Sequence, residues 1–380
     1  MIYLDNNATT AIASEVREAM LPFLGPEFGN PSSAHSAGRQ VRDAVDRARS
    51  SVATLLGADG SEIVFTSGGT ESDNSAIRGA LEIAPQKKHI VTTRVEHEAV
   101  RKLCEKFERE GYRVSWLDVD SDGALDLDQL RDCLSDDTAL VSVMLANNET
   151  GVLFPVDEIG AIVKEHSNAL FHVDGVNAAG KIPIDLSSGM IDMFSISAHK
   201  FHGPKGIGAL YIRNGVQIPS LSIGGGQESG RRAGTEAVHQ IAGIGAAAEL
   251  VKDLSTMESV RALRDKLERS ILSSIPVASV NGTRDPSRRL PNTSNISFEN
   301  LNGEALLAHL DDAGICVSTG SACNAADHTA SAVLQAMDIP YSKAMGSIRF
   351  SLGRFNTEDE IDVVVSAIKE ATRQLEGLCS

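Results

Sequence analysis

Short segments rich in β-branched and aromatic residues recur seven times in the first 212 residues, and helical patterns separate the earlier ones. These segments lie at residues 62–66, 89–93, 113–117, 138–144, 169–173, 193–196 and 207–212. Strands that alternate with helices in this way usually pair in parallel, because each helical connection crosses back over the sheet. We therefore predict an α/β fold with a mostly parallel seven-stranded sheet covered by helices on both faces.

The order of elements changes in the second half of the chain. A helical pattern continues from Gly234 to about Ser273 and is followed by short mixed elements. We expect strands at residues 294–298, 315–318 and 347–352 and helices at residues 304–313, 331–337 and 357–375. This order is typical of a smaller α+β domain. We assign residues 12–255 to the large domain and residues 1–11 and 256–380 to the small domain.

Composition and charge limit the partners of the chain. The 380 residues carry a net charge of −16, which disfavours direct binding to nucleic acid. The first residues lack a signal-peptide pattern, and no uncharged apolar segment is long enough to span a bilayer. We therefore expect a cytoplasmic protein without a membrane partner. The five cysteines, at positions 104, 133, 316, 323 and 379, form no CxxC pair, so we predict reduced thiols.

A lysine follows the sixth predicted strand, in the segment Ser197-Ala198-His199-Lys200, and a Gly/Pro turn at residues 203–206 comes soon after it. Open α/β sheets bind their ligands at the carboxyl ends of the strands, where this lysine is expected. A lysine held there suits a Schiff base with pyridoxal phosphate. From these four residues alone, an exposed loop lysine without function is the simpler interpretation.

Other polar residues follow other predicted strands. Gly69 and Thr70 lie between the first strand and a helix, where free backbone amides can bind a phosphate. Asp174 follows the strand at 169–173 and could pair with a protonated pyridine nitrogen. His97 starts a helix after the second strand, and Asn148 lies in a turn after the fourth. Each residue also has an ordinary explanation as a helix cap or a turn residue.

Cys323 lies in a run of small and polar residues at 319–326. An exposed loop of this kind could present a thiolate nucleophile, whereas a cysteine in the core is inert. A surface cysteine without function is the alternative interpretation.

An acidic segment that begins at Asp118 resembles the start of an EF-hand loop. Its twelfth position is Gln129, where calcium requires a bidentate glutamate. A strand pattern precedes it, where an EF-hand requires a helix. We therefore predict an acidic turn and no metal site.

Taken together, these segments resemble the pyridoxal-phosphate-dependent cysteine desulfurases, the NifS/IscS-like branch of the class V aminotransferase family. The matching words are Y-L-D-N-N-A-T-T (3–10), F-G-N-P-S-S (28–33), T-S-G-G-T-E-S-D-N (66–74), E-H (96–97), N-N-E-T-G (147–151), H-V-D (172–174), S-A-H-K (197–200), G-R-R-A-G-T (230–235), S-T-G-S-A-C (318–323) and R-F-S-L-G-R-F (349–355). They span nearly the whole chain in family order. The resemblance implies the fold of a fold type I pyridoxal-phosphate-dependent transferase.

The resemblance also implies residue roles toward the cofactor. Lys200 holds pyridoxal phosphate covalently and later acts as a base at the substrate Cα, Asp174 pairs with the pyridinium nitrogen, and His97 lies over the ring. The remaining implied cofactor contacts are Gly69, Thr70, Asn148, Asn177, Ser197 and His199, with Thr235 supplied by the partner subunit of a homodimer.

For the substrate, the resemblance implies that Arg349 binds the carboxylate of L-cysteine and that Asn148 lies near it. Cys323 takes the sulfur as a persulfide, alanine leaves, and the sulfur passes to an acceptor protein, for example in iron–sulfur cluster assembly or tRNA thiolation. A selenocysteine lyase or a small-substrate aminotransferase on the same fold is the alternative. A catalytically idle binding protein is a third interpretation.

The sequence departs from the family pattern at two places. After Asp174 the family usually has Ala-x-Gln, whose Gln bonds the phenolic oxygen of the cofactor, whereas this chain has Gly175-Val176-Asn177. Asn177 is one methylene shorter than glutamine. After the cysteine, residues 329–331 read Thr-Ala-Ser where the family often has an acidic residue, proline and serine.

Overall fold

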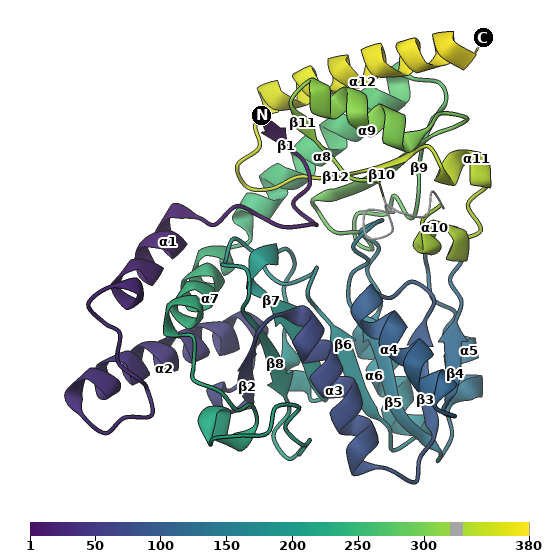
Figure 1. The fold of residues 1–380 in the computed structure, drawn as a ribbon. Coiled ribbons are helices and arrows are strands. Elements are labelled where there is room, and N and C mark those ends of the chain that lie inside the picture. Colours follow the sequence, from purple (N-terminus) through teal and green to yellow (C-terminus); the bar gives the residue numbers. More distant parts are fainter. Residues whose placement is uncertain (320–329, 380) are drawn as a thin grey trace.

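The computed structural model describes residues 1–319 and 330–379, which form two lobes (Figure 1). The large lobe is built on a seven-stranded sheet, and the small lobe carries the C-terminal helix α12 (Glu358–Cys379). The N-terminus lies in the small lobe, and the chain then runs toward the large lobe (Figure 1). Residues near the start of the chain therefore reach the junction between the lobes.

The large sheet has the strand order β2-β8-β7-β6-β5-β3-β4. Its strands are β2 (Ile63–Thr66), β3 (His89–Thr93), β4 (Arg113–Leu117), β5 (Thr138–Met144), β6 (Leu170–Asp174), β7 (Met193–Ser197) and β8 (Gly208–Ile212). Strand β8 runs antiparallel to β2 and β7, and the other pairings in this sheet are parallel. The predicted mostly parallel seven-stranded sheet is confirmed, with every strand boundary within one residue of its predicted position.

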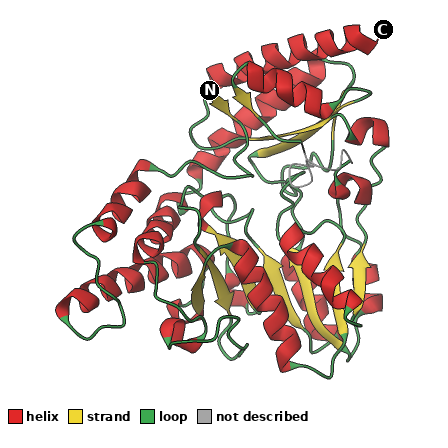
Figure 2. Cartoon of the chain, viewed as in Figure 1, coloured by secondary structure: helices red, strands yellow, loops and turns green. Residues whose placement is uncertain are grey.

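Helices cover both faces of this sheet (Figure 2). The clusters of buried side chains place α3 (Gly69–Ile83) and α4 (Glu98–Arg109) on one face. The other face packs against α2 (Ser36–Leu56), α5 (Leu127–Cys133), α6 (Val156–His166) and α7 (Val238–Val251). In β2, Val64 belongs to the first cluster while Ile63 and Phe65 belong to the second, as the alternation of side chains along a strand requires. Helix α1 (Ser14–Met20) packs on α7.

The small lobe contains an antiparallel sheet of β9 (Ala278–Val280), β10 (Thr293–Phe298) and β12 (Ser347–Ser351), in the order β12-β10-β9. Strand β1 (Ile2–Tyr3) pairs in parallel with β11 (Ile315–Cys316). Helices α8 (Ser255–Ser274), α9 (Gly303–Asp312) and α12 contribute to the buried cluster of this lobe. Two short helices, α10 (Ala332–Ala336) and α11 (Tyr341–Ala344), lie between β11 and β12 in the chain, and Val333, Leu334 and Ala344 pack into the buried cluster of the large lobe. The predicted α+β part is confirmed.

The helical pattern between Gly234 and Ser273 forms two helices, α7 and α8, rather than one. The break lies at residues 252–254, where an Asp253 side-chain oxygen accepts a hydrogen bond from the backbone amide of Ser255 at 2.8 Å. Aspartate competes with helical backbone bonding in this way, which favours a new helix start. The break lies next to the domain boundary predicted at residue 255, and that boundary stays a prediction. Across the described residues, no helix is long and apolar enough to cross a membrane.

Candidate active site

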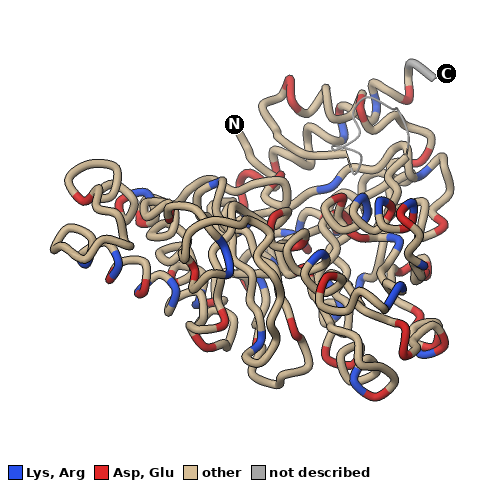
Figure 3. Tube along the Cα trace, turned by 60° about the horizontal axis from the view of Figure 1, so that its bottom comes forward, with Lys and Arg blue, Asp and Glu red and all other residues tan. Residues whose placement is uncertain are grey.

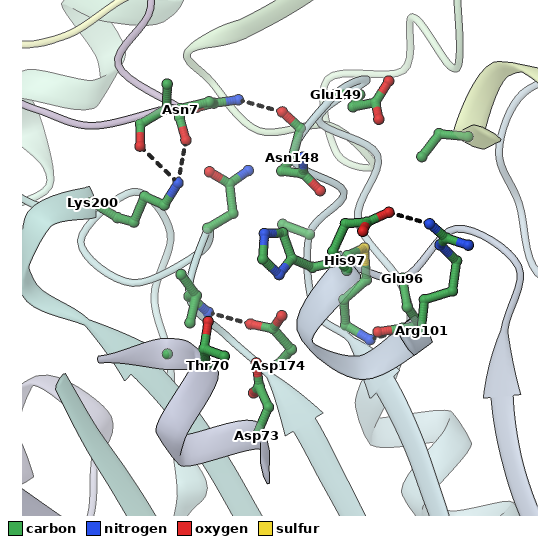
Figure 4. A pocket seen from close by; sticks show the side chains of 18 of the residues that line it. Asn7, Thr70, Asp73, Glu96, His97, Arg101, Asn148, Glu149, Asp174 and Lys200 are labelled. Atoms are coloured by element: carbon green, nitrogen blue, oxygen red, sulfur yellow. Dashed lines mark hydrogen bonds and ion pairs between the residues drawn. The ribbon is translucent and has the colours of Figure 1, made fainter. Parts of the chain in front are cut away.

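A cavity of about 470 Å³ lies between the two lobes, at the carboxyl edge of the large sheet (Figure 4). Strands β3, β5, β6 and β7 run parallel and end at this edge. His97 follows β3, Asn148 follows β5, Asp174 ends β6, and Lys200 follows β7. Four segments that are distant in the sequence therefore place side chains around one cavity, as a parallel sheet dictates.

Lys200 is held at the cavity by the N-terminal segment. Its Nζ donates hydrogen bonds to the backbone oxygens of Asn7, at 2.5 Å, and Ala8, at 3.1 Å (Figure 4). The lysine ends a short 3₁₀ turn, Ala198–Lys200, that continues directly from β7. The rigid strand and the crossing segment together fix where the amine lies.

Asp174 lies at the carboxyl end of β6, with only 5% of its surface exposed. One of its oxygens accepts a hydrogen bond from the amide of Val176 at 2.9 Å. Burial raises the pKa of Asp174, while the hydrogen bond from the amide of Val176 and the charge of Lys200 oppose this shift. A cationic ring nitrogen beside this carboxylate would compensate the cost of its burial.

Two further carboxyl groups line the cavity, and the sequence analysis missed both as site residues. Asp73 and Glu96 are 1% and 5% exposed, and each has one oxygen, Oδ1 and Oε2 respectively, without a hydrogen-bond partner. Burial raises the pKa of Glu96 to about 8 and also raises that of Asp73, and Asp174 adds to both shifts. Asp73 follows Gly69 by four positions on α3, so helical spacing alone could have placed both on one face.

His97 caps the N-terminus of α4. Its Nδ1 accepts a hydrogen bond from the amide of Ala99 at 3.2 Å. Burial lowers the pKa of His97, and the charge of Lys200 lowers it further, although Asp174 raises it. The cap needs an unprotonated Nδ1, so the geometry and the pKa both favour a neutral imidazole that carries its proton on Nε2.

The N-terminus of α3 opens onto the cavity without a side-chain cap. The 15-residue helix directs its first amides and its positive dipole end toward Gly69 and Thr70. A Cβ atom on Gly69 would lie 2.6 Å from a Val176 methyl carbon, so only glycine fits there. Ser197 and His199 line the same cavity. Uncapped amide donors of this kind form an anion site.

Arg349 reaches the cavity from β12 in the small lobe and is 5% exposed. Its Nη1 donates to the backbone oxygen of Asn148 at 3.0 Å, and its Nη2 lies 2.6 Å from an oxygen of Asp5. Among the described residues, no group bonds its buried Nε. Arg349 therefore retains donor capacity for a carboxylate in the cavity.

The turn after β5 supplies another buried carboxyl group. Ser331 donates a hydrogen bond to Glu149 at 2.5 Å, which joins this turn to the start of α10. Burial raises the pKa of Glu149 to about 7, despite the opposing effects of Ser331 and Arg349. Asn147 stabilises the turn, because its side-chain oxygen accepts hydrogen bonds from the amides of Glu149 and Thr150.

The chain matches the family model described as "Aminotransferase class-V" over residues 2–364. The chain belongs to this family. Among curated members, a cysteine desulfurase of Nostoc sp. strain PCC 7120 is 53% identical over 380 residues, which cover 100% of this chain and 94% of the relative. Cysteine desulfurase NifS of Azotobacter vinelandii is 51% identical, with coverage of 99% and 94%.

Solved structures of the family agree with the fold. A "NIFS-LIKE PROTEIN" superposes with a TM-score of 0.92 at 40% identity, and the match covers 98% of this chain and 100% of that structure. A structure described as "SspA in complex with cysteine" gives a TM-score of 0.83 at 34% identity, with coverage of 94% and 100%. The predicted resemblance to cysteine desulfurases is confirmed, and so is the fold type I architecture with pyridoxal phosphate as the family cofactor.

The residues of the cavity fit this class V cofactor. The uncapped amides of α3 suit its phosphate, Asp174 suits its ring nitrogen, and the Lys200 amine lies in the same cavity. Of the residues predicted to bind cofactor or substrate, the following line the cavity: Gly69, Thr70, His97, Asn148, Asp174, Asn177, Ser197, His199, Lys200 and Arg349.

Among the described residues predicted for the site, Thr235 does not line the cavity and is exposed in the loop before α7. Cys323 lies outside the described residues. Asn7 and Glu149 also line the cavity, as Asp73 and Glu96 do. Neither was predicted as a site residue, although Asn7 lies in the family word Y-L-D-N-N and Glu149 in N-N-E-T-G.

Proposed function

We propose that this chain removes sulfur from L-cysteine, leaves L-alanine, and carries the sulfur as a persulfide on Cys323. The observation that supports this most strongly is the single cavity that brings together Lys200, Asp174, the open end of α3 and Arg349. Family membership specifies the cofactor and the reaction class. The residues of the cavity support the roles proposed for the groups of this chain.

Three groups would hold the cofactor. The amides at Gly69 and Thr70 would bind its phosphate, Asp174 would pair with its ring nitrogen, and Lys200 would bind it covalently. When bound, pyridoxal phosphate supplies an electron sink that weakens the bonds at the Cα and Cβ of an amino acid. Asp174 would keep the ring nitrogen protonated, and a neutral His97 would add no charge to the site.

The substrate is oriented by the junction between the lobes. Arg349 binds the carboxylate of cysteine, which directs the amino group toward the Lys200 side of the cavity. Lys200 then serves as the base that moves the Cα proton.

Cys323 collects the sulfur. Its thiolate attacks the sulfur of the substrate, an S–S bond forms, the C–S bond breaks, and the carbon fragment takes up a proton to become alanine. One thiolate and one cysteine thus give one persulfide and one alanine, without an external oxidant. An acceptor protein takes the terminal sulfur and regenerates the thiolate.

The deciding experiment uses the purified holoprotein. Borohydride should fix the cofactor to Lys200, and incubation with cysteine under a reductant should release sulfide and alanine in equal amounts. Cys323→Ser should retain the cofactor spectrum and lose sulfide release by at least about 100-fold, because a serine hydroxyl is a poor nucleophile at neutral pH. Full sulfide release by this variant, or faster amino transfer to a keto acid, would contradict the proposal.

We further propose that the active form is a homodimer in which Thr235 of one chain contacts the cofactor phosphate of the other. Its exposed position outside the cavity of its own chain supports this arrangement. Mixing Thr235→Ala chains with Lys200→Ala chains should restore one intact site per heterodimer, and light scattering should give a mass of two chains.

Basic residues are interspersed with acidic ones along the chain (Figure 3). The cytoplasmic location remains a prediction that cell fractionation tests.

A further inference from the structure

Lys181 is a buried lysine that the proposed mechanism does not use. It lies seven residues after the end of β6 and is 7% exposed. Burial lowers its pKa well below the usual value, and the charges of Lys200 and Arg349 lower it further. A buried amine near two cations is costly. An apolar side chain of similar volume would fill the space without this cost. The hydrogen-bond partners of the amine therefore indicate why a lysine is present here.

Within the described residues, both hydrogen bonds of the Lys181 amine go to one residue. Its Nζ donates to the backbone oxygen of Asn177 at 2.8 Å and to the side-chain Oδ1 of Asn177 at 2.9 Å. The oxygen of the Asn177 amide therefore faces Lys181, and its amino group faces the opposite way.

The opposite side of the Asn177 amide is the cavity. Asn177 is 5% exposed and lines the cavity next to Val176 and Asp174. Its Nδ2 donates to the backbone oxygen of Asn147 at 3.3 Å, which is long for a hydrogen bond. This bond uses one of the two amino hydrogens, so the second is available for an acceptor within the cavity.

We propose that Lys181 is a positioning residue that fixes the amide of Asn177 with its amino group toward the cavity, as a hydrogen-bond donor to the phenolic oxygen of bound pyridoxal phosphate. This inference rests on the proposed function. It addresses the departure at this site, where asparagine is one methylene shorter than the glutamine of the family. A shorter arm needs a fixed orientation, and the two bonds from Lys181 supply it.

The test is a double-mutant cycle that reads the pH dependence of the absorbance of the bound cofactor, not activity. A donor to the phenolic oxygen stabilises its anion and lowers the pH midpoint of the spectral change. Asn177→Ala and Lys181→Met should therefore each raise the midpoint by about one pH unit, the size of one hydrogen bond. The double variant should match Asn177→Ala alone, because Lys181 acts through Asn177.

Two other variants separate positioning from charge. Lys181→Gln removes the charge and keeps a donor for the Asn177 oxygen, so its midpoint should stay near that of the wild type. Lys181→Leu, which also lacks a donor, replaces Lys181→Met if the latter does not fold. Lys252→Met, which changes an exposed lysine, is the matched control. Additive shifts in the cycle, or equal shifts in the Gln and Met variants, would overturn the proposal in favour of a through-space charge effect.

The wild-type protein separates this failure from that of the proposed function. If borohydride fixes no cofactor to Lys200, the function itself is wrong and the inference falls with it. If the cofactor is fixed and the midpoint of Lys181→Met equals that of the wild type, only the role of Lys181 is wrong.

Discussion

The buried carboxyl groups of the cavity differ in how well their surroundings favour a negative charge. Asp174, Asp73 and Glu96 are all buried, and each of their pKa values is raised by burial. The charge of Lys200 and the amide of Val176 oppose the shift at Asp174, so these contacts favour its ionised form. Burial favours the neutral form of the other two carboxyl groups. Their unpartnered oxygens can carry the protons that keep them neutral.

Glu96 supplies a test of this arrangement through pH. Its pKa is about 8 in the folded chain, whereas the unfolded chain releases this proton near the ordinary value. Between these values the folded state binds more protons, so its stability falls as pH rises. Glu96→Gln keeps the size and removes the titration. Relative to the variant, the wild type should lose about 2 kcal/mol of unfolding free energy between pH 6 and pH 8.

Urea unfolding of both proteins at a series of pH values measures this difference. Glu149 titrates in the same window with the same sign, since burial raises its pKa to about 7, but it is common to both proteins and cancels. Parallel pH profiles for the two proteins would show that Glu96 is ionised in the folded state.

At the scale of elements, the site depends on how closely β6 and β7 approach each other where they end. Gly175 follows β6, and a Cβ atom there would lie 1.9 Å from Cζ of Phe194 in β7. The ring of Phe194 is fully buried and occupies the space that a methyl group on residue 175 would need. This pair explains why glycine fits at residue 175.

We expect Gly175→Ala to destabilise the chain by about 1–3 kcal/mol, because the added methyl group overpacks the core against Phe194. Phe194→Leu removes the ring atoms that clash. Gly175→Ala should therefore cost less unfolding free energy in the Phe194→Leu background than in the wild type. Denaturant midpoints of the four proteins complete the cycle. Additive losses would mean that Gly175 is required for its backbone and not for the space beside the ring.

The sequence predicted some elements well and others poorly for physical reasons. Strands such as β5 are buried along their whole length, so their apolar runs were clear. The break between α7 and α8 was missed because it rests on one Asp253 side chain rather than on proline or glycine. Residue types with a chemical role at a strand end, such as Lys200, could be predicted. The spacing of Asp73 from Gly69 could be read from the sequence, but its burial and its raised pKa depend on tertiary packing.

At the scale of the whole molecule, Asn7 connects the two lobes at the cavity. Its Nδ2 donates to the backbone oxygen of Asn148 in the large lobe and to Oγ1 of Thr293 in the small lobe. Its Oδ1 accepts from Asn292, and its backbone oxygen accepts from Lys200. One residue thus connects both lobes and the amine that holds the cofactor.

Asn6 offers a matched control, because its side chain bonds only Tyr3 and Ser351 in the small lobe within the described structure. Asn6→Ala and Asn7→Ala each remove buried hydrogen bonds and should each cost about 1–3 kcal/mol. Only Asn7→Ala should also uncouple the lobes, so its calorimetric unfolding enthalpy should exceed its van't Hoff enthalpy. Since the cavity is lined from both lobes, the same variant should raise KM for cysteine more than Asn6→Ala does. Equal enthalpy ratios in both variants would show that other contacts at the junction couple the lobes.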